Sequence, residues 1–270
     1  MGRRHIRNII LKEWALLFTD LNSALVVTLL PFLVVGQGIV YIWLAFRFAG
    51  ESMLAIQVFQ NGLQRLVEAV PEVAGLPSNE QLLVLLLSQF SFFLLLIPTM
   101  IAISVATFSI VDEKLSGSLE AVLATPVKTW ELLLGKALAG AVPALVMTWL
   151  SAAVFLLVVS ALGWGDLNRF VATAGWFLTL FLLTPAVAIL SFMLGVAGSS
   201  RAKDARSAQT IALLIIFPVF AVIGIQITGV VWFTPLLILL LALVVGIAGF
   251  VSLRAAVRLF RRESILVQWR

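Results

Sequence analysis

Long apolar stretches without a charged residue dominate this chain. A helix that crosses a bilayer needs about 20 apolar residues, and a charge at the bilayer centre costs at least ~2.5 kcal/mol. The last apolar window, 207–253, is long enough for two spans and contains Gly224, Gly229 and Pro235, so we divide it near 226–234. The pattern predicts an all-α integral membrane protein with six transmembrane helices. These lie at about residues 24–46, 81–111, 137–162, 170–198, 207–225 and 233–253.

Two shorter segments carry apolar residues at helical spacing, with polar residues on the opposite face. The first predicts an amphipathic interfacial helix over residues 1–20, with Trp14 as an anchor, which is either passive or in contact with a partner. The second predicts a helix within 47–80 that ends at Pro71 and is either simply interfacial or a lid. The apolar positions are Ile6, Ile9, Ile10, Trp14, Leu17 and Phe18, and then Phe59, Leu63, Leu66, Val67 and Val70.

Composition excludes several classes of protein. The chain is 62% hydrophobic and only 11% charged, far from the ~25% charged residues of a soluble domain, so a water-soluble fold, a coiled coil and a disordered chain are excluded. Without cysteine there is no disulfide framework or thiolate metal site. A single histidine, His5, argues against a histidine metal site or a Ser–His–Asp triad.

The basic residues indicate the orientation in the membrane. Fifteen of the 18 Lys and Arg residues fall in segments that share one side if both termini are cytoplasmic, and only Arg47, Arg65 and Arg169 lie elsewhere. By the positive-inside rule, the 112–136 loop and the basic 254–270 tail are cytoplasmic, and 47–80 is an outer loop. We therefore expect a multi-pass protein of the cell (cytoplasmic) membrane. The sequence pI of about 10.2 reflects this topology, and no nucleic-acid partner is expected.

The 112–136 loop combines charged residues with an apolar helical face. Its pattern predicts a short helix parallel to the membrane, ended by Pro126, which cannot continue it. Gly117 allows close backbone approach by another surface. By periodicity alone this is one more interfacial helix, with Leu115, Leu119, Val122 and Leu123 on its apolar face.

The order of residues from 113 to 136 resembles the loop of ABC-2 type transporter permeases. That pattern has a Glu, a Gly-Ser/Thr-Leu four residues on, then Leu-Leu-x-Ser/Thr-Pro and finally Glu-aliphatic-Leu-x-Gly-Lys. Val122 stands where leucine is commoner, which keeps the apolar face, and 226–234 is too short for the large outer insertion of several branches. The matching residues are Glu113, Gly117-Ser118-Leu119, Val122-Leu123-Ala124-Thr125-Pro126 and Glu131-Leu132-Leu133-Leu134-Gly135-Lys136.

The resemblance implies a single ABC-2 type transmembrane domain over residues 1–270. It implies the permease subunit of an ATP-driven exporter, paired with a second copy or a paralogue and with two copies of a separate cytoplasmic ABC ATPase. In this family the loop includes a coupling helix that sits in a groove of the ATPase. The residues that this assigns to coupling are Glu113, Gly117, Leu119, Glu120, Leu123 and Pro126, with Lys128 and Glu131 as flanking contacts.

The source of energy has to lie outside this chain. No phosphate-binding loop occurs, because Gly135-Lys136 is followed by Ala137 and Trp130 stands where the first glycine would be. We therefore expect no enzyme activity, metal or cofactor in this chain, with ATP and Mg²⁺ held by the ATPase. Ionisable residues are absent from the interiors of the predicted spans, which argues against ion coupling.

Some aspects of function stay open at this level. Gln37 and Gln89 are the candidates for a translocation path, because an amide within a span has to face protein or water. Gly135 and Ala139 suit close helix packing without identifying the partner helix. An ion-gradient-driven secondary carrier and a non-transporting membrane scaffold remain alternatives, and the substrate does not follow from the sequence.

Overall fold

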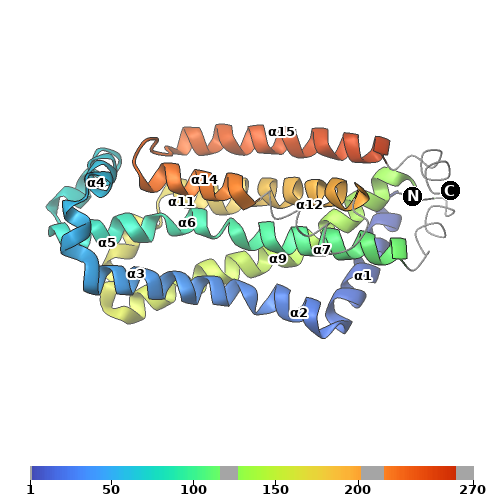
Figure 1. Ribbon diagram of the computed structural model, residues 1–270, viewed down its shortest axis with the longest axis horizontal. Helices are drawn as coiled ribbons and strands as arrows, with labels where there is room; N and C mark the ends of the chain where they lie inside the picture. The colour runs from blue at the N-terminus through green and yellow to red at the C-terminus, as the bar shows by residue number, and fades with distance from the viewer. Residues whose placement is uncertain (1, 116–126, 202–215, 260–270) are drawn as a thin grey trace.

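The computed structural model describes residues 2–115, 127–201 and 216–259, and its regular secondary structure in these ranges is helical. Long helices run side by side in an elongated bundle (Figure 1). The elements of the first half are α1 (Gly2–Thr19), α2 (Leu21–Thr28), α3 (Leu30–Ala55), α4 (Gln57–Ala69), η1 (Pro71–Gly75), α5 (Ser78–Ser88), α6 (Phe90–Phe93) and α7 (Leu96–Leu115). Those of the second half are α9 (Thr129–Val159), η2 (Ser160–Trp164), η3 (Gly165–Leu167), α10 (Asn168–Val171), α11 (Ala174–Leu178), η4 (Thr179–Leu183), α12 (Thr184–Arg201), α14 (Ile216–Ile227) and α15 (Pro235–Leu259).

Five helical segments are long and apolar enough to cross a membrane. They correspond to five of the six spans expected from the sequence. The expected span at 207–225 lies partly outside the described residues, and its described portion is the short apolar helix α14. Six spans therefore stay a prediction. The five segments are Leu21–Ala55, Ser78–Ala106, Thr129–Val171, Ala174–Val196 and Pro235–Arg258.

The bundle has two distinct ends. The α1 end carries α1, the start of α9 and the last turns of α7 and α15, and the opposite α4 end carries α4 and the turn between α14 and α15 (Figure 1). Successive long helices run in alternate directions between these ends. The loop of interest for coupling is thus attached to the α1 end.

Some helices extend beyond the apolar windows. α3 continues through Arg47 and Glu51 to Ala55, although the sequence predicts that the outer loop begins at Arg47. α9 likewise begins at Thr129, eight residues before the charge-free window. The reason is that a charged residue ends the apolar region without ending the helix, because Arg and Glu are good helix formers.

The first two helical breaks, at Asp20 and Leu29, separate the direction of α1 from that of α3. Asp20 caps α2 by accepting hydrogen bonds from the Ser23 backbone N–H at 2.9 Å and from the Ser23 hydroxyl at 2.6 Å. The Ser23 hydroxyl, followed by its backbone N–H, holds the pKa of Asp20 below its usual value. A second break at Leu29 precedes Pro31 in the first turn of α3, where a proline is tolerated. As a result, α1 turns across the long axis of the bundle (Figure 1).

The core is built around α5–α7, α9 and α12. In the segment Ser78–Ala106, 83% of the most apolar window is buried, whereas the value for Pro235–Arg258 is 17%, so α15 is peripheral. Phe90 on α6 stacks on Phe155 of α9 with ring centroids 4.0 Å apart and contacts Gly38 of α3. α12 packs closely on α7, because a Cβ at Gly195 would lie only 2.9 Å from that of Ala106.

The α4 end is closed by a tight turn between α14 and α15. Gly229 in this turn has φ of +67°, a conformation that favours glycine. A Cβ at Gly229 would lie 3.0 Å from the backbone nitrogen of Gly62 on α4, so the turn and α4 meet backbone to backbone. α4 itself occupies Gln57–Ala69 and ends just before Pro71.

Candidate coupling site

The described structure includes only part of the 113–136 segment. Glu113 lies in the last turns of α7, and the structure does not describe its side chain. Lys128 and Glu131, at the start of α9, are described in full. Five of the residues expected to couple lie outside the described residues, namely Gly117, Leu119, Glu120, Leu123 and Pro126.

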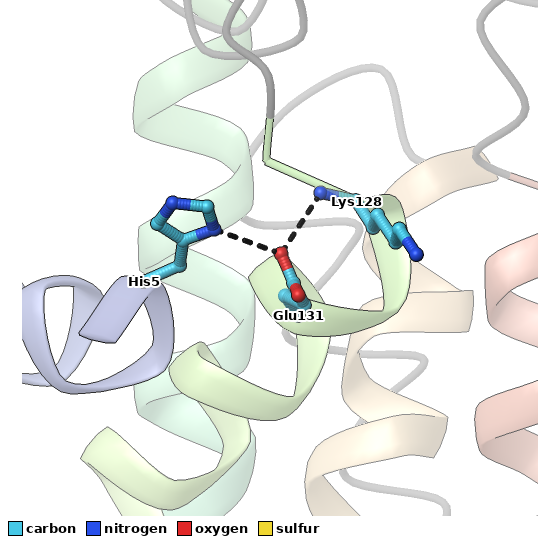
Figure 2. A network of polar contacts seen from close by, with 3 residues as sticks. All are labelled: His5, Lys128 and Glu131. Carbon is cyan, nitrogen blue, oxygen red and sulfur yellow. Dashed lines mark hydrogen bonds and ion pairs between the residues drawn. The ribbon is translucent and has the colours of Figure 1, made fainter. Parts of the chain in front are cut away.

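The start of α9 is organised by a side chain that reaches back to the backbone. Lys128 has an extended conformation and is the N-cap residue, and its backbone N–H donates to Oε2 of Glu131 at 3.1 Å. A glutamate at the third helical position is suited to this role, because it satisfies an N–H that has no partner within the helix. The Lys128 side chain is exposed and points away from Glu131 (Figure 2).

The same carboxylate oxygen also contacts α1. His5 Nδ1 lies 3.2 Å from Oε2 of Glu131, so one oxygen joins the imidazole and the helix cap (Figure 2). The Glu131 side chain is 6% exposed and that of His5 is 34% exposed. When His5 is protonated this contact is an ion pair, and with the proton on Nδ1 the neutral ring still donates.

Three further contacts extend this junction along both helices. A Cβ at Gly135 would lie 2.9 Å from Cγ2 of Ile9, so the two helices approach closely there. Next to it, the Lys136 ammonium lies 2.8 Å from Oε1 of Glu13, with 2% and 9% of the two side chains exposed. The Trp14 indole N–H donates to the Ala139 carbonyl at 2.9 Å. We call these four pairs the α1–α9 interface: His5–Glu131, Ile9–Gly135, Glu13–Lys136 and Trp14–Ala139.

The buried ion pair makes this interface specific. Two charges removed from water regain most of the lost hydration energy only when their geometry is good, so such a pair adds little net stability. Removal of one partner, however, leaves a buried charge and is strongly destabilising. Loss of either Glu13 or Lys136 is therefore expected to disturb the packing of α1 on α9.

The sequence contains a signal for this pair outside the 113–136 motif, on the face of α1. Glu13 falls at i+7 from Ile6 and i−4 from Leu17, on the apolar face of α1. An acidic residue on an apolar face needs a partner, and Lys136 directly precedes a charge-free window. Trp14, expected to anchor in lipid, instead donates its N–H to α9.

The two candidate path residues lie in different environments. Gln37 is on the exposed side of α3 and donates to the Tyr41 hydroxyl at 2.7 Å. Gln89 is buried between α5 and α6, where its amide donates to the Ser88 hydroxyl at 3.2 Å and its Oε1 has no partner among the described residues. The structure does not bring these two side chains together, and their role in a path stays a prediction.

Comparison with known proteins identifies the family. In the described ranges, no group of three or more His, Cys, Asp or Glu side chains is placed to hold a metal ion. No curated protein and no solved structure matches the chain. The family model described as ABC-2 family transporter protein matches residues 7–239, from within α1 to within α15. This chain therefore belongs to the ABC-2 transporter family.

Proposed function

We propose that the chain is the permease subunit of an ATP-driven exporter and works as a dimer with two copies of a cytoplasmic ABC ATPase. Family membership makes it a permease of an ABC transporter, a membrane component that is not itself catalytic. Export, the partner ATPase and the dimer are the parts that we propose. Export and the dimer rest on the resemblance of the 113–136 loop, and the observation that supports coupling to an ATPase is the α1–α9 interface.

Through this interface, a movement of the loop is transmitted to the other helices of the bundle. α9 begins at Thr129, three residues after Pro126, so a displacement of the proposed coupling helix reaches α9 through a very short link. The first turns of α9 are tied to α1 by a buried ion pair and by Glu131. We infer that α1 and the start of α9 move as one rigid unit.

The proposed orientation follows from charge. With the α1 end in the cytoplasm, α1, the start of α9 and Arg254 and Arg258 of α15 lie on the side where positive residues accumulate. The ATPase then meets the 113–126 segment from the cytoplasm. Rigid-body tilting of the spans switches access between the two sides.

The first experiment asks whether an ATPase is present. The full chain, extracted in a mild detergent, is expected to co-purify with an ABC ATPase, and this complex is expected to hydrolyse ATP after reconstitution. If the purified chain contains no ATPase and an uncoupler abolishes its transport in vesicles that still hold ATP, the secondary-carrier alternative replaces our proposal.

The second experiment tests the coupling residues. Gly117→Trp and Glu113→Ala are expected to reduce permease-dependent ATP hydrolysis in the co-reconstituted complex. Glu68→Ala is the matched control, because Glu68 is 64% exposed on α4 at the opposite end and, among the described residues, forms a local ion pair with Arg65 at 3.0 Å. Full activity of both loop variants would show that the assignment of this loop is wrong.

A further inference from the structure

An open hollow lies between the start of α9 and the last turns of α15, both of which are at the α1 end of the bundle (Figure 1). It has a volume of about 470 Å³, within the ~300–1,000 Å³ that is usual for ligand pockets. It opens to the outside of the bundle, because Trp130 and Phe250 in its wall are 41% and 54% exposed. Its lining consists of Trp130, Phe250, Leu253, Arg254, Val257 and Arg258.

The two sides of α15 differ at this end. Ala256 is buried in a cluster with Leu133 of α9 and Phe192 of α12. Arg254 and Arg258 lie two residues before and after it, which on a helix of 3.6 residues per turn is the opposite side, and both are exposed. The packed side fixes the rotation of α15, so the two arginines face the surroundings of the bundle.

The hollow lies where α15 changes from apolar to charged. Phe250 belongs to the exposed apolar surface of α15, and Arg254 and Arg258 follow it one and two turns later. At this point a membrane helix passes from the hydrocarbon into the headgroup layer, and tryptophan, here Trp130 of α9, is enriched at the same depth. The hollow therefore offers apolar contact beside positive charge, which matches the two parts of a phospholipid.

The polar groups of this lining are all donors. Neither guanidinium forms an ion pair or a hydrogen bond with another described residue, and the indole N–H of Trp130 is the other polar side-chain group of the lining. The Cζ atom of Arg254 lies over the Phe250 ring, 4.5 Å from its centroid. This contact holds the guanidinium against the wall and leaves its N–H groups, which match the oxygens of a phosphate, to bind an anion.

We propose that this hollow binds one anionic phospholipid from the leaflet at the α1 end. The phosphate lies between Arg254 and Arg258, and the acyl chains lie against Phe250 and Leu253. A zwitterionic lipid is disfavoured, because its ammonium group would meet two like charges and no carboxylate in the lining. The lipid contacts α9 and α15 at once, and the site depends neither on ATP coupling nor on the direction of transport.

The test is native mass spectrometry of the full chain, purified in a detergent that removes lipid. The two probes are dioleoylphosphatidylglycerol and dioleoylphosphatidylcholine, which have the same acyl chains and differ in the net charge of the headgroup. We expect the first phosphatidylglycerol to bind roughly 30-fold more tightly than the first phosphatidylcholine, since each of two arginines adds ~1 kcal/mol for an anionic lipid.

Two variants and a third probe make the test specific. Arg254→Gln combined with Arg258→Gln is expected to abolish the preference, and both positions are exposed, so folding is not at risk. Arg4→Gln combined with Arg7→Gln removes the same charge from exposed positions on α1, at the same end, and is expected to keep it. Glycerol phosphate has the phosphate without the acyl chains and is expected not to displace phosphatidylglycerol at equal concentration.

Four results would overturn the proposal. Equal binding of the two lipids by the wild type would mean that the arginines do not select an anionic lipid. A preference that survives replacement of Arg254 and Arg258, or that is lost equally when Arg4 and Arg7 are replaced, would place the binding elsewhere. Glycerol phosphate that binds as tightly as the lipid would indicate a site for a free phosphate. A dimer that binds no phosphatidylglycerol and dissociates when Arg254 and Arg258 are replaced would show that a second copy covers the hollow.

Discussion

At the scale of single residues, the most informative group is the buried pair of Glu13 and Lys136. The two charges come from positions 123 residues apart and are almost fully removed from solvent. Such a pair adds little to the net stability of the fold, but removing one of its two charges is strongly destabilising. This difference leads to a measurable prediction.

We expect Lys136→Met to lower the free energy of unfolding by about 3–5 kcal/mol, because removing one partner breaks a buried ion pair and leaves the Glu13 carboxylate in a buried place. The double variant Lys136→Met with Glu13→Leu is expected to regain most of this loss, as measured by thermal unfolding in detergent. Arg65→Met is the control, since its exposed pair with Glu68 is worth at most ~1 kcal/mol. A double variant as unstable as the single one would contradict the pairing.

Asp20 leads to a prediction on pH. Its pKa is lowered in the folded protein, so its capping interaction stabilises the fold above the ordinary carboxyl pKa and is lost as the pH falls through the lowered value. Asp20→Ala is expected to reduce the unfolding temperature at pH 7. The difference from the wild type should shrink toward pH 3, and a difference independent of pH would contradict this interpretation.

Glu131 leads to a prediction on coupling. Glu131→Ala removes both the contact with His5 and the cap on Lys128, and we expect it to lower permease-dependent ATP hydrolysis in the complex. Glu131→Gln keeps an acceptor oxygen for the Lys128 N–H and is expected to retain more activity. If the two variants lose activity equally, the charge rather than the cap is what matters.

At the scale of elements, periodicity predicts helices well but not their neighbours. The helical spacing of Ile6, Ile10 and Trp14 indicates an amphipathic helix, and α1 occupies Gly2–Thr19. The same pattern suits a helix lying in lipid and a helix packed on protein, because both bury one apolar face. The close approach at Gly135 and the Glu13–Lys136 pair are features of the folded chain.

A substitution at Gly135 tests this packing. Gly135→Val is expected to push α1 away from α9, because even a Cβ would lie 3.0 Å from Cβ of Ile9, an atom that cannot rotate away. Faster tryptic cleavage at Arg4 and Arg7 would report the release of α1. Gly36→Val is the control, since outside its own helical turn no atom of the described residues lies within 4 Å of a Cβ at that position. Unchanged cleavage of Gly135→Val would show that α1 is not held by this contact, and so would faster cleavage of the control alone.

At the scale of the whole molecule, the exposed surface is that of a protein in lipid. α15 is long and apolar, and most of its apolar window is exposed, including Leu239 and Leu243 at 47% and 58%. A large apolar surface of this kind is covered by lipid or by another protein. The proposed bilayer orientation can be tested because the chain has no cysteine.

Single cysteines are expected to report the two sides of the membrane. Arg65→Cys on α4 should react with an impermeant maleimide in intact cells, and Lys128→Cys at the start of α9 should react only after permeabilisation. Both positions are exposed in the structure. Leu239→Cys on α15 is the control, and lipid should protect it in both conditions. Labelling of Lys128→Cys in intact cells would reverse the proposed orientation.

The sequence by itself determined that this protein lies in a lipid bilayer, that it is helical, and which family its loop motif resembles. Long uncharged windows and the break near Gly229 result from transfer energies and backbone preferences, which are properties of short segments. Only the tertiary structure decided that α1 is held on α9 by Glu13 and Lys136, and that the turn at Gly229 meets Gly62 of α4 backbone to backbone. These features join residues distant in the chain, so they depend on how faces pack in space, which segmental patterns do not specify.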